Sequence, residues 1–144
     1  MADPLFIDSW GWLALEDSKD PDHDRAAQFY RAFRRQNGRA LTTDYVLDET
    51  ITLLFRRRPF AESRRFVEGL LAAAASGYLI IQRITSQRFA KAWQLRLRYH
   101  DKPDISFTDL TSFVVMEEEK VADVLTNDRH FTQVNLGFTA VPSL

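Results

Sequence analysis

The sequence predicts an α/β protein with a three-layer α/β/α arrangement around a central parallel sheet of about five strands. Three observations carry this prediction. Short apolar runs alternate with one or two helical patterns along the 144 residues. Acidic residues follow two of these runs within two positions, where parallel strands leave a sheet. No glycine-, proline- or serine-rich segment divides the chain, so we expect residues 1–144 to form a single domain.

The first half of the chain begins with an apolar run, Leu5 to Ile7, which we predict to be a strand with Asp8 at its exit. The acidic segment 11–24 predicts a short helix and then a loop. Apolar residues at helical spacing predict the next helix, which an Asn-Gly pair closes. A brief strand follows, and Thr43 or Asp44 caps a third helix. The helix closed by Asn-Gly spans 24–36, the brief strand spans 39–43, and the third helix begins at 43 or 44.

The second half continues with a helix that starts after Pro59 and forms a hairpin with the helix before it. An apolar run rich in isoleucine and leucine predicts a buried strand. A long helix comes next, and another begins at Ser106, where a serine cap and the acid Asp109 form a capping-box pattern. A buried strand and a last edge strand before Pro142 complete the chain. The ranges are 61–75 for the first helix, 78–81 for the strand, 86–100 for the long helix, 106–116 for the capped helix, and 122–126 and 137–141 for the last strands.

The long helix at 86–100 has two contrasting sides. Phe89, Trp93 and Leu97 lie on one side, basic residues project from the other, and the segment contains no acid. An all-basic outer face favours contact with a phosphate backbone, although a plainly solvated face is the alternative. The basic residues are Arg88, Lys91 and Arg98.

Acidic residues gather at one edge of the predicted sheet. Asp8 and Asp128 leave the carboxyl ends of strands, and Asp109 lies in the first turn of a helix. Another helix offers Asp48 and Glu49 on opposite flanks of its apolar stripe, and periodicity does not choose between them. An acid in a first turn or after a strand also has a plain role in dipole compensation or in a turn. Four carboxylates drawn together without lysine are, in contrast, good ligands for a hard cation.

The composition excludes several classes of function. The chain has no cysteine, which excludes disulfides and thiolate metal sites and fits a cytoplasmic setting. A formal net charge of −1 argues against wholesale coating by nucleic acid, while local basic faces stay possible. No apolar run reaches the roughly 18 residues of a membrane span and no secretory signal is visible, so we expect no membrane association.

Four short motifs resemble those of the PIN domain, the Rossmann-like nuclease fold shared by VapC-type toxins and several RNA-processing endonucleases. The motifs are Ile7-Asp8-Ser9-Trp10, Val46-Leu47-Asp48-Glu49, Phe107-Thr108-Asp109 and Leu125-Thr126-Asn127-Asp128-Arg129-His130-Phe131. The resemblance spans nearly the whole chain and implies a metal-binding, catalytic quartet, in which it selects Glu49 over Asp48. The quartet is Asp8, Glu49, Asp109 and Asp128. Ser9 matches a small hydroxyl residue that often follows the first acid, and we expect it to contact the substrate.

The resemblance also implies the activity, which is cleavage of single-stranded RNA with Mg²⁺ or Mn²⁺ as cofactor. These ions prefer oxygen ligands and keep several waters, so few protein groups can hold them. We expect Asp8 and Asp128 to be direct ligands and Asp109 to be a ligand or to position one. Glu49 would orient the attacking water or a second ion. The implied partners are the RNA substrate, a second copy in a homodimer and a small antitoxin whose peptide fills the acidic groove.

Three alternatives stand beside the toxin of a toxin–antitoxin pair. An RNA-maturation nuclease of the same family would use the same acids, but the compact length without an appended RNA-binding domain favours a toxin. A phosphatase of the haloacid-dehalogenase type needs a second acid two residues after Asp8, where Trp10 stands. A non-catalytic binding module would keep the fold without turnover, although no acid of the quartet is missing.

Overall fold

The computed structural model describes residues 3–142, and in this part of the chain five short strands form one parallel sheet. The strand order is β3-β2-β1-β4-β5, and every neighbouring pair is parallel. The predicted strands are therefore all present, with slightly different ends. Their bounds are Leu5–Ile7 (β1), Ala40–Thr43 (β2), Leu79–Gln82 (β3), Asp123–Leu125 (β4) and Thr139–Val141 (β5).

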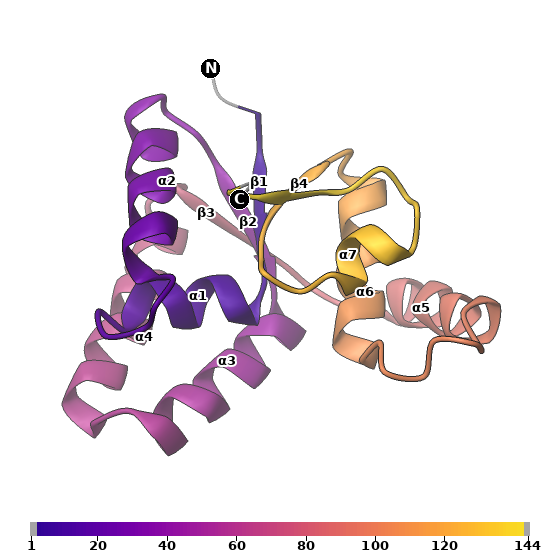
Figure 1. Ribbon diagram of the computed structural model, residues 1–144, viewed down its shortest axis with the longest axis horizontal. Coiled ribbons are helices and arrows are strands. Elements are labelled where there is room, and N and C mark those ends of the chain that lie inside the picture. Colours follow the sequence, from indigo (N-terminus) through magenta and orange to yellow (C-terminus); the bar gives the residue numbers. More distant parts are fainter. Residues whose placement is uncertain (1–2, 143–144) are drawn as a thin grey trace.

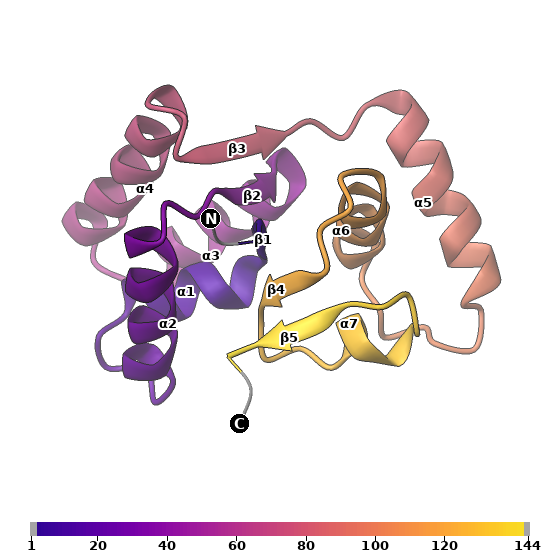
Figure 2. The ribbon, with the colours of Figure 1, turned by 90° about the horizontal axis from the view of Figure 1, so that it is seen from above.

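Helices cover both faces of this sheet (Figures 1 and 2). Viewed from above, α1, α2 and α4 lie on one side and α5, α6 and α7 on the other, and α3 packs against α1 and α4. This confirms the predicted three-layer α/β/α arrangement. The helices between residues 3 and 142 are Ser9–Glu16 (α1), His23–Arg35 (α2), Asp44–Arg57 (α3), Phe60–Ala75 (α4), Ser86–Arg98 (α5), Phe107–Glu118 (α6) and His130–Gln133 (α7). No helix in this range combines the length and apolar character needed to cross a lipid bilayer.

The direction in which strands are added reverses at β1. From β1 the chain adds β2 and β3 on one side, and it later adds β4 and β5 on the other. Ile7 at the end of β1 lies opposite Leu125 at the end of β4. The residues that follow these two strands therefore meet in the crevice where open α/β sheets bind ligands.

β1 is buried along its whole length because helices cover both of its faces. Its three residues are each at most 1% exposed, and such a continuous apolar run is typical of a central parallel strand. On the side of α6, the rings of Phe113 and Phe131 pack edge to face with centroids 5.0 Å apart. Phe131 is fully buried and follows the loop that leaves β4, so this contact fixes the loop against α6.

Side-chain caps begin two of the helices that form the site. Thr43 Oγ1 accepts a hydrogen bond of 3.0 Å from the backbone three residues on, and Ser106 Oγ accepts one of 3.0 Å from the N–H of Asp109. Thr43 is therefore the cap of α3. Asp44 instead accepts from the N–H of Ile84 at 3.0 Å, which ties the start of α3 to the segment after β3.

The sequence predicted the position in the sheet correctly for one edge strand and wrongly for the other. β5 forms one edge, as Pro142 predicted. β3 forms the other, so its predicted burial is wrong: Leu79 is buried, and the rest of the strand is half-buried. An apolar run fits an edge strand as well as a central one, and only the strand order tells them apart.

Helix α5 faces the opposite way from the prediction. Ala92 and Leu95 are buried, whereas Phe89, Trp93 and Leu97 are 47%, 50% and 50% exposed. The reason is that α5 packs on α6 and not directly on the sheet. Helical spacing identifies an apolar stripe but does not say which side of the helix finds a partner.

The basic residues of α5 are placed differently as well. Arg88 is directed at α6, where its guanidinium bonds Glu118 at 2.7 Å and Glu119 at 3.2 Å, and Lys91 Nζ lies 2.5 Å from Glu118. The predicted all-basic outer face is therefore wrong for Arg88 and Lys91, because acids from another helix neutralise them. Of the three predicted cations, Arg98 alone forms no ion pair within residues 3–142.

Gly11 in α1 lies so close to β4 that a side chain does not fit. A Cβ there would lie 2.6 Å from the carbonyl oxygen of Leu125 and 2.9 Å from Cγ2 of Ile7. We expect Gly11→Ala to lower the free energy of unfolding by about 1–3 kcal/mol, measured by urea denaturation. Gly69→Ala is the control, because nothing lies within 4 Å of a Cβ at that position in α4. Equal losses in the two variants would contradict the steric argument.

Candidate metal and catalytic site

Asp8 comes directly after β1 and caps α1. Its Oδ1 accepts a hydrogen bond of 2.9 Å from the N–H of Gly11, and its Oδ2 accepts one of 2.5 Å from the hydroxyl of Thr126. Thr126 follows β4, so the second bond connects the ends of the two strands at the point where the strand order reverses. With Asp8 only 5% exposed, these contacts hold its carboxylate in one orientation at the sheet edge.

Asp109 lies in the first turn of α6, where the predicted capping box is only half formed. Its backbone N–H bonds Ser106, but its carboxylate is directed at the loop after β4, with Oδ2 3.4 Å from Nδ1 of His130. A side chain that only compensated the helix dipole would need no such partner. Asp109 therefore takes part in a tertiary cluster.

Asp128 belongs to a compact turn after β4. Thr126 Oγ1 accepts from the N–H of Asp128 at 2.9 Å, and Asp128 Oδ1 accepts from the N–H of His130 at 2.8 Å. These bonds are the expected turn chemistry. The same turn brings Asp128 Oδ1 within 3.1 Å of His130 Nδ1. Thr126 thus links two acids, since its hydroxyl donates to Asp8 and accepts from the backbone of Asp128.

Burial and mutual repulsion raise the pKa of two of these acids to about 7. For Asp8 burial is the main cause; its hydrogen-bond donors oppose the rise, and the charges of Asp109 and Asp128 add to it. For Asp109 burial again comes first, the charge of Asp128 adds, and the contact with His130 acts in the opposite direction. Within residues 3–142 no lysine or arginine pairs with any of the three. Buried carboxylates without such a partner are typical of cation sites.

Glu49 lies beside this cluster. The side chains of Glu49 and Asp48 are both exposed on α3. The charge of Glu49 is one of the causes of the raised pKa of Asp109. This placement agrees with the choice of Glu49 that the family resemblance made. The catalytic role of Glu49 stays a prediction.

Ser9 is turned to a different partner from the one expected. Its side chain is buried, and its hydroxyl donates to the carbonyl oxygen of Val46 at 3.4 Å, which joins α1 to α3. A buried hydroxyl with a backbone acceptor contributes to helix packing. The contacts of Ser9 therefore do not support the expected substrate contact. The same holds for Arg88 and Lys91, whose charges are used on α6.

Sequence reasoning gave no role to two residues of the site, Thr126 and His130. A signal was present: Thr126, Asp128 and His130 occupy alternate positions after a strand. A hydroxyl, a carboxylate and an imidazole at this spacing in a turn can face one site together. Their partners, however, come from β1 and α6, which the spacing does not reveal.

The donor set of this cluster fits a divalent cation. Asp109, Asp128 and His130 each offer a ligand atom, and these atoms all lie within 4.8 Å of one another. Asp8 adds a carboxylate next to them, since its charge and theirs interact. Carboxylate oxygens suit hard divalent ions and imidazole nitrogen suits transition metals. The arrangement can therefore bind a metal ion.

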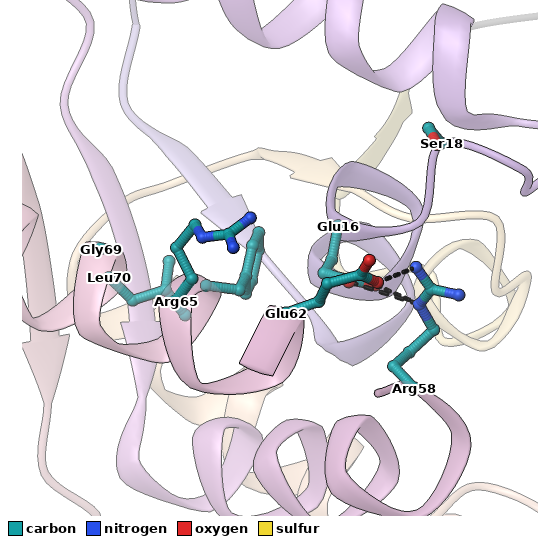
Figure 3. A pocket seen from close by; sticks show the side chains of 8 residues that line it. Glu16, Ser18, Arg58, Glu62, Arg65, Gly69 and Leu70 are labelled. Atoms are coloured by element: carbon teal, nitrogen blue, oxygen red, sulfur yellow. Dashed lines mark hydrogen bonds and ion pairs between the residues drawn. The ribbon is translucent and has the colours of Figure 1, made fainter. Parts of the chain in front are cut away.

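A separate cavity of about 480 Å³ lies between α1 and α4, away from the acid cluster (Figure 3). Next to it, the guanidinium of Arg58 bonds Glu16 of α1 at 3.0 Å and Glu62 of α4 at 2.7 Å. Arg58 therefore links α1 to α4. No acid of the cluster lines the cavity, so it is not part of the candidate site. Its lining residues are Glu16, Ser18, Arg58, Glu62, Arg65, Phe66, Gly69 and Leu70.

The PIN domain family matches residues 5–136, and the chain therefore belongs to that family. Among curated relatives, it is similar to the 23S rRNA-specific endonuclease VapC20 of Mycobacterium tuberculosis. The two are 29% identical over 137 residues, which cover 95% of this chain and 97% of that protein. It is also similar to the VapC ribonuclease of Archaeoglobus fulgidus, with 32% identity over 133 residues, 91% of this chain and 81% of the relative.

Two solved structures share the fold. The crystal structure of Mycobacterium tuberculosis VapC20, described as a sarcin-ricin loop cleaving toxin, has a TM-score of 0.80 at 28% identity and covers 95% of this chain and 98% of that one. VapBC2 from Rickettsia felis, bound to a DNA fragment from its promoter, has a TM-score of 0.71 at 15% identity and covers 95% and 96%. The predicted PIN-like fold is confirmed.

Proposed function

We propose that the protein is a metal-dependent endoribonuclease and acts as the toxin of a toxin–antitoxin pair. One observation carries the proposal: Asp8, Asp109 and Asp128 come from three separate elements and converge without a lysine or arginine partner in the described part of the chain. The relatives support the reaction class, since they are named endonuclease and ribonuclease.

Each acid has a distinct part in this proposal. Asp8 and Asp128 bind the cation, Asp109 binds it or positions a ligand, and Glu49 at the exposed rim orients the attacking water. Mg²⁺ or Mn²⁺, when bound, supplies Lewis-acid stabilisation of charge on the phosphodiester oxygens. Thr126 restricts the orientation of Asp8 through a 2.5 Å hydrogen bond, so the carboxylate is positioned before substrate arrives.

Ribosomal RNA is the substrate class to test first. VapC20 is named a 23S rRNA-specific endonuclease and described as cleaving the sarcin-ricin loop. The proposed protein partner is a small antitoxin, because a structural neighbour is a VapBC complex. A homodimer and a cytoplasmic place of action stay predictions. Sedimentation analysis of the purified protein would measure its oligomeric state.

Cleavage assays with α3 variants test the proposed function. The wild-type protein with Mg²⁺ or Mn²⁺ is expected to cut RNA in purified ribosomes, and a chelator is expected to stop it. Glu49→Gln is expected to lower the rate by about 100-fold, because it removes the carboxylate that orients the attacking water. Asp48→Asn is the matched control on the same helix and is expected to keep the wild-type rate.

Two outcomes would count against this proposal. If Asp48→Asn abolished cleavage and Glu49→Gln did not, the assignment on α3 would be wrong. If the wild-type protein cut neither ribosomal nor total cellular RNA with either ion, the nuclease proposal itself would fail.

A further inference from the structure

His130 places an imidazole nitrogen within the carboxylate cluster. Its Nδ1 lies 3.1 Å from Asp128 Oδ1 and 3.4 Å from Asp109 Oδ2. In octahedral coordination with bonds of about 2.1 Å, adjacent ligand atoms lie about 3.0 Å apart. The nitrogen therefore lies about as far from each of these oxygens as neighbouring ligands around one ion lie from each other.

The fold holds this ring in place from two directions. The N–H of His130 donates to Asp128 at 2.8 Å, which ties the start of α7 to the turn. The next residue, Phe131, is fully buried against Phe113. Phe113 lies one helical turn after Asp109, on the same side of α6. The aromatic contact that anchors the loop therefore also sets His130 against Asp109.

We propose that His130 is a direct nitrogen ligand of the cation, beside Asp128 and Asp109, and that it makes the site prefer a first-row transition ion such as Mn²⁺ to Mg²⁺. The inference rests on the proposed metal-dependent function and adds a ligand to the four acids expected from the family. Mg²⁺ strongly prefers oxygen ligands, whereas imidazole is a good ligand for transition ions. Replacing one oxygen by nitrogen therefore costs Mg²⁺ more than Mn²⁺.

A different role for His130 fits the same distances. The imidazole would hydrogen-bond the carboxylates and position them, and the ion would have oxygen ligands alone. The two roles differ in a measurable property, because a nitrogen bound to Mn²⁺ couples to its unpaired electrons. A nitrogen that only orients a carboxylate does not give the coupling of a direct ligand.

Pulsed electron paramagnetic resonance of the wild-type protein with one equivalent of Mn²⁺ tests the inference. We expect the ¹⁴N coupling of a directly bound imidazole. It should vanish in His130→Asn and persist in His100→Asn, a matched control at an exposed histidine just after α5. In calorimetric titrations, His130→Asn should weaken Mn²⁺ binding by at least about 10-fold and Mg²⁺ binding by less.

Several results would overturn the inference. If Mn²⁺ bound the wild-type protein without ¹⁴N coupling, His130 would not be a ligand, while the proposed metal-dependent function would still stand. Equal weakening of Mn²⁺ and Mg²⁺ in His130→Asn would show that His130 only positions the acids. A wild-type protein that binds neither ion would overturn the proposed function as well. If His130→Asn failed to fold, the wild-type spectrum would decide the matter alone.

Discussion

Asp8→Asn is expected to lower the rate of RNA cleavage by at least about 100-fold while the fold persists, because the change removes a charged metal ligand. Asparagine has nearly the same size and can still accept from the N–H of Gly11. In the wild type, Oδ2 of Asp8 accepts a hydrogen bond from the hydroxyl of Thr126. The asparagine amide places either an N–H donor or an uncharged oxygen at this position, while the bond from Gly11 can persist. Cleavage assays measure the first effect, and circular dichroism checks that the fold is retained.

The same loss is expected of Asp109→Asn and Asp128→Asn, since these acids bring their carboxylates to the cluster from other elements. Asp22→Asn is the control for removing a carboxylate elsewhere, because Asp22 lies just before α2 and pairs with Arg25 at 3.3 Å. Its rate should stay near that of the wild type. Wild-type turnover in Asp8→Asn would mean that the clustered acids are not one catalytic site.

Without divalent metal, the wild-type protein is expected to lose stability relative to Asp8→Asn as the pH rises from about 4 to 7. Burial is the main reason why the pKa of Asp8 and of Asp109 rises from 3.8 to about 7 in the folded state. Between these values the folded chain binds more protons than the unfolded chain, so the free energy of unfolding falls with increasing pH. For Asp8 a rise of about three units corresponds to about 4 kcal/mol.

Urea denaturation at pH 5 and pH 7 in chelator measures this effect. At pH 5 Asp8 is protonated in the folded chain but mostly ionised in the unfolded chain, so the wild type has already lost part of this stability, and its difference from Asp8→Asn should be smaller than at pH 7. At pH 7 Asp8→Asn should be the more stable protein. Millimolar Mn²⁺ should raise the melting temperature of the wild type more at pH 7 than at pH 5, where protons compete for the ligands. An equal Mn²⁺ shift in Asp8→Asn would contradict a single metal site that includes Asp8.

The alternation of strands and helices was predictable because each element depends on a local pattern. The run Leu5 to Ile7 forms β1, and Ser106 begins α6 through a bond to a residue three positions on. Apolar spacing and capping act within a few residues, so the sequence displays them directly. The ends of the elements moved by only a few residues.

The orientation of α5 was not predictable in this way. Its most apolar stripe, which contains Trp93, faces outward, and the side with Arg88 and Lys91 packs on α6. The acids that receive those two cations lie about 30 residues further along the chain, at Glu118 and Glu119. A pattern within one helix does not include a partner that another helix supplies.

For the site, the sequence alone determined which carboxylates follow strands or open helices, and the family motifs selected Glu49 over Asp48. Only the tertiary structure decided that Thr126 bonds Asp8, 118 positions away, and that His130 meets Asp109, 21 positions away. Hydrogen bonds and charge repulsion depend on distance in space, whatever the separation along the chain. The raised pKa values of Asp8 and Asp109, and the nitrogen placed between carboxylates, therefore exist only once the ends of β1 and β4 and the first turn of α6 are brought together.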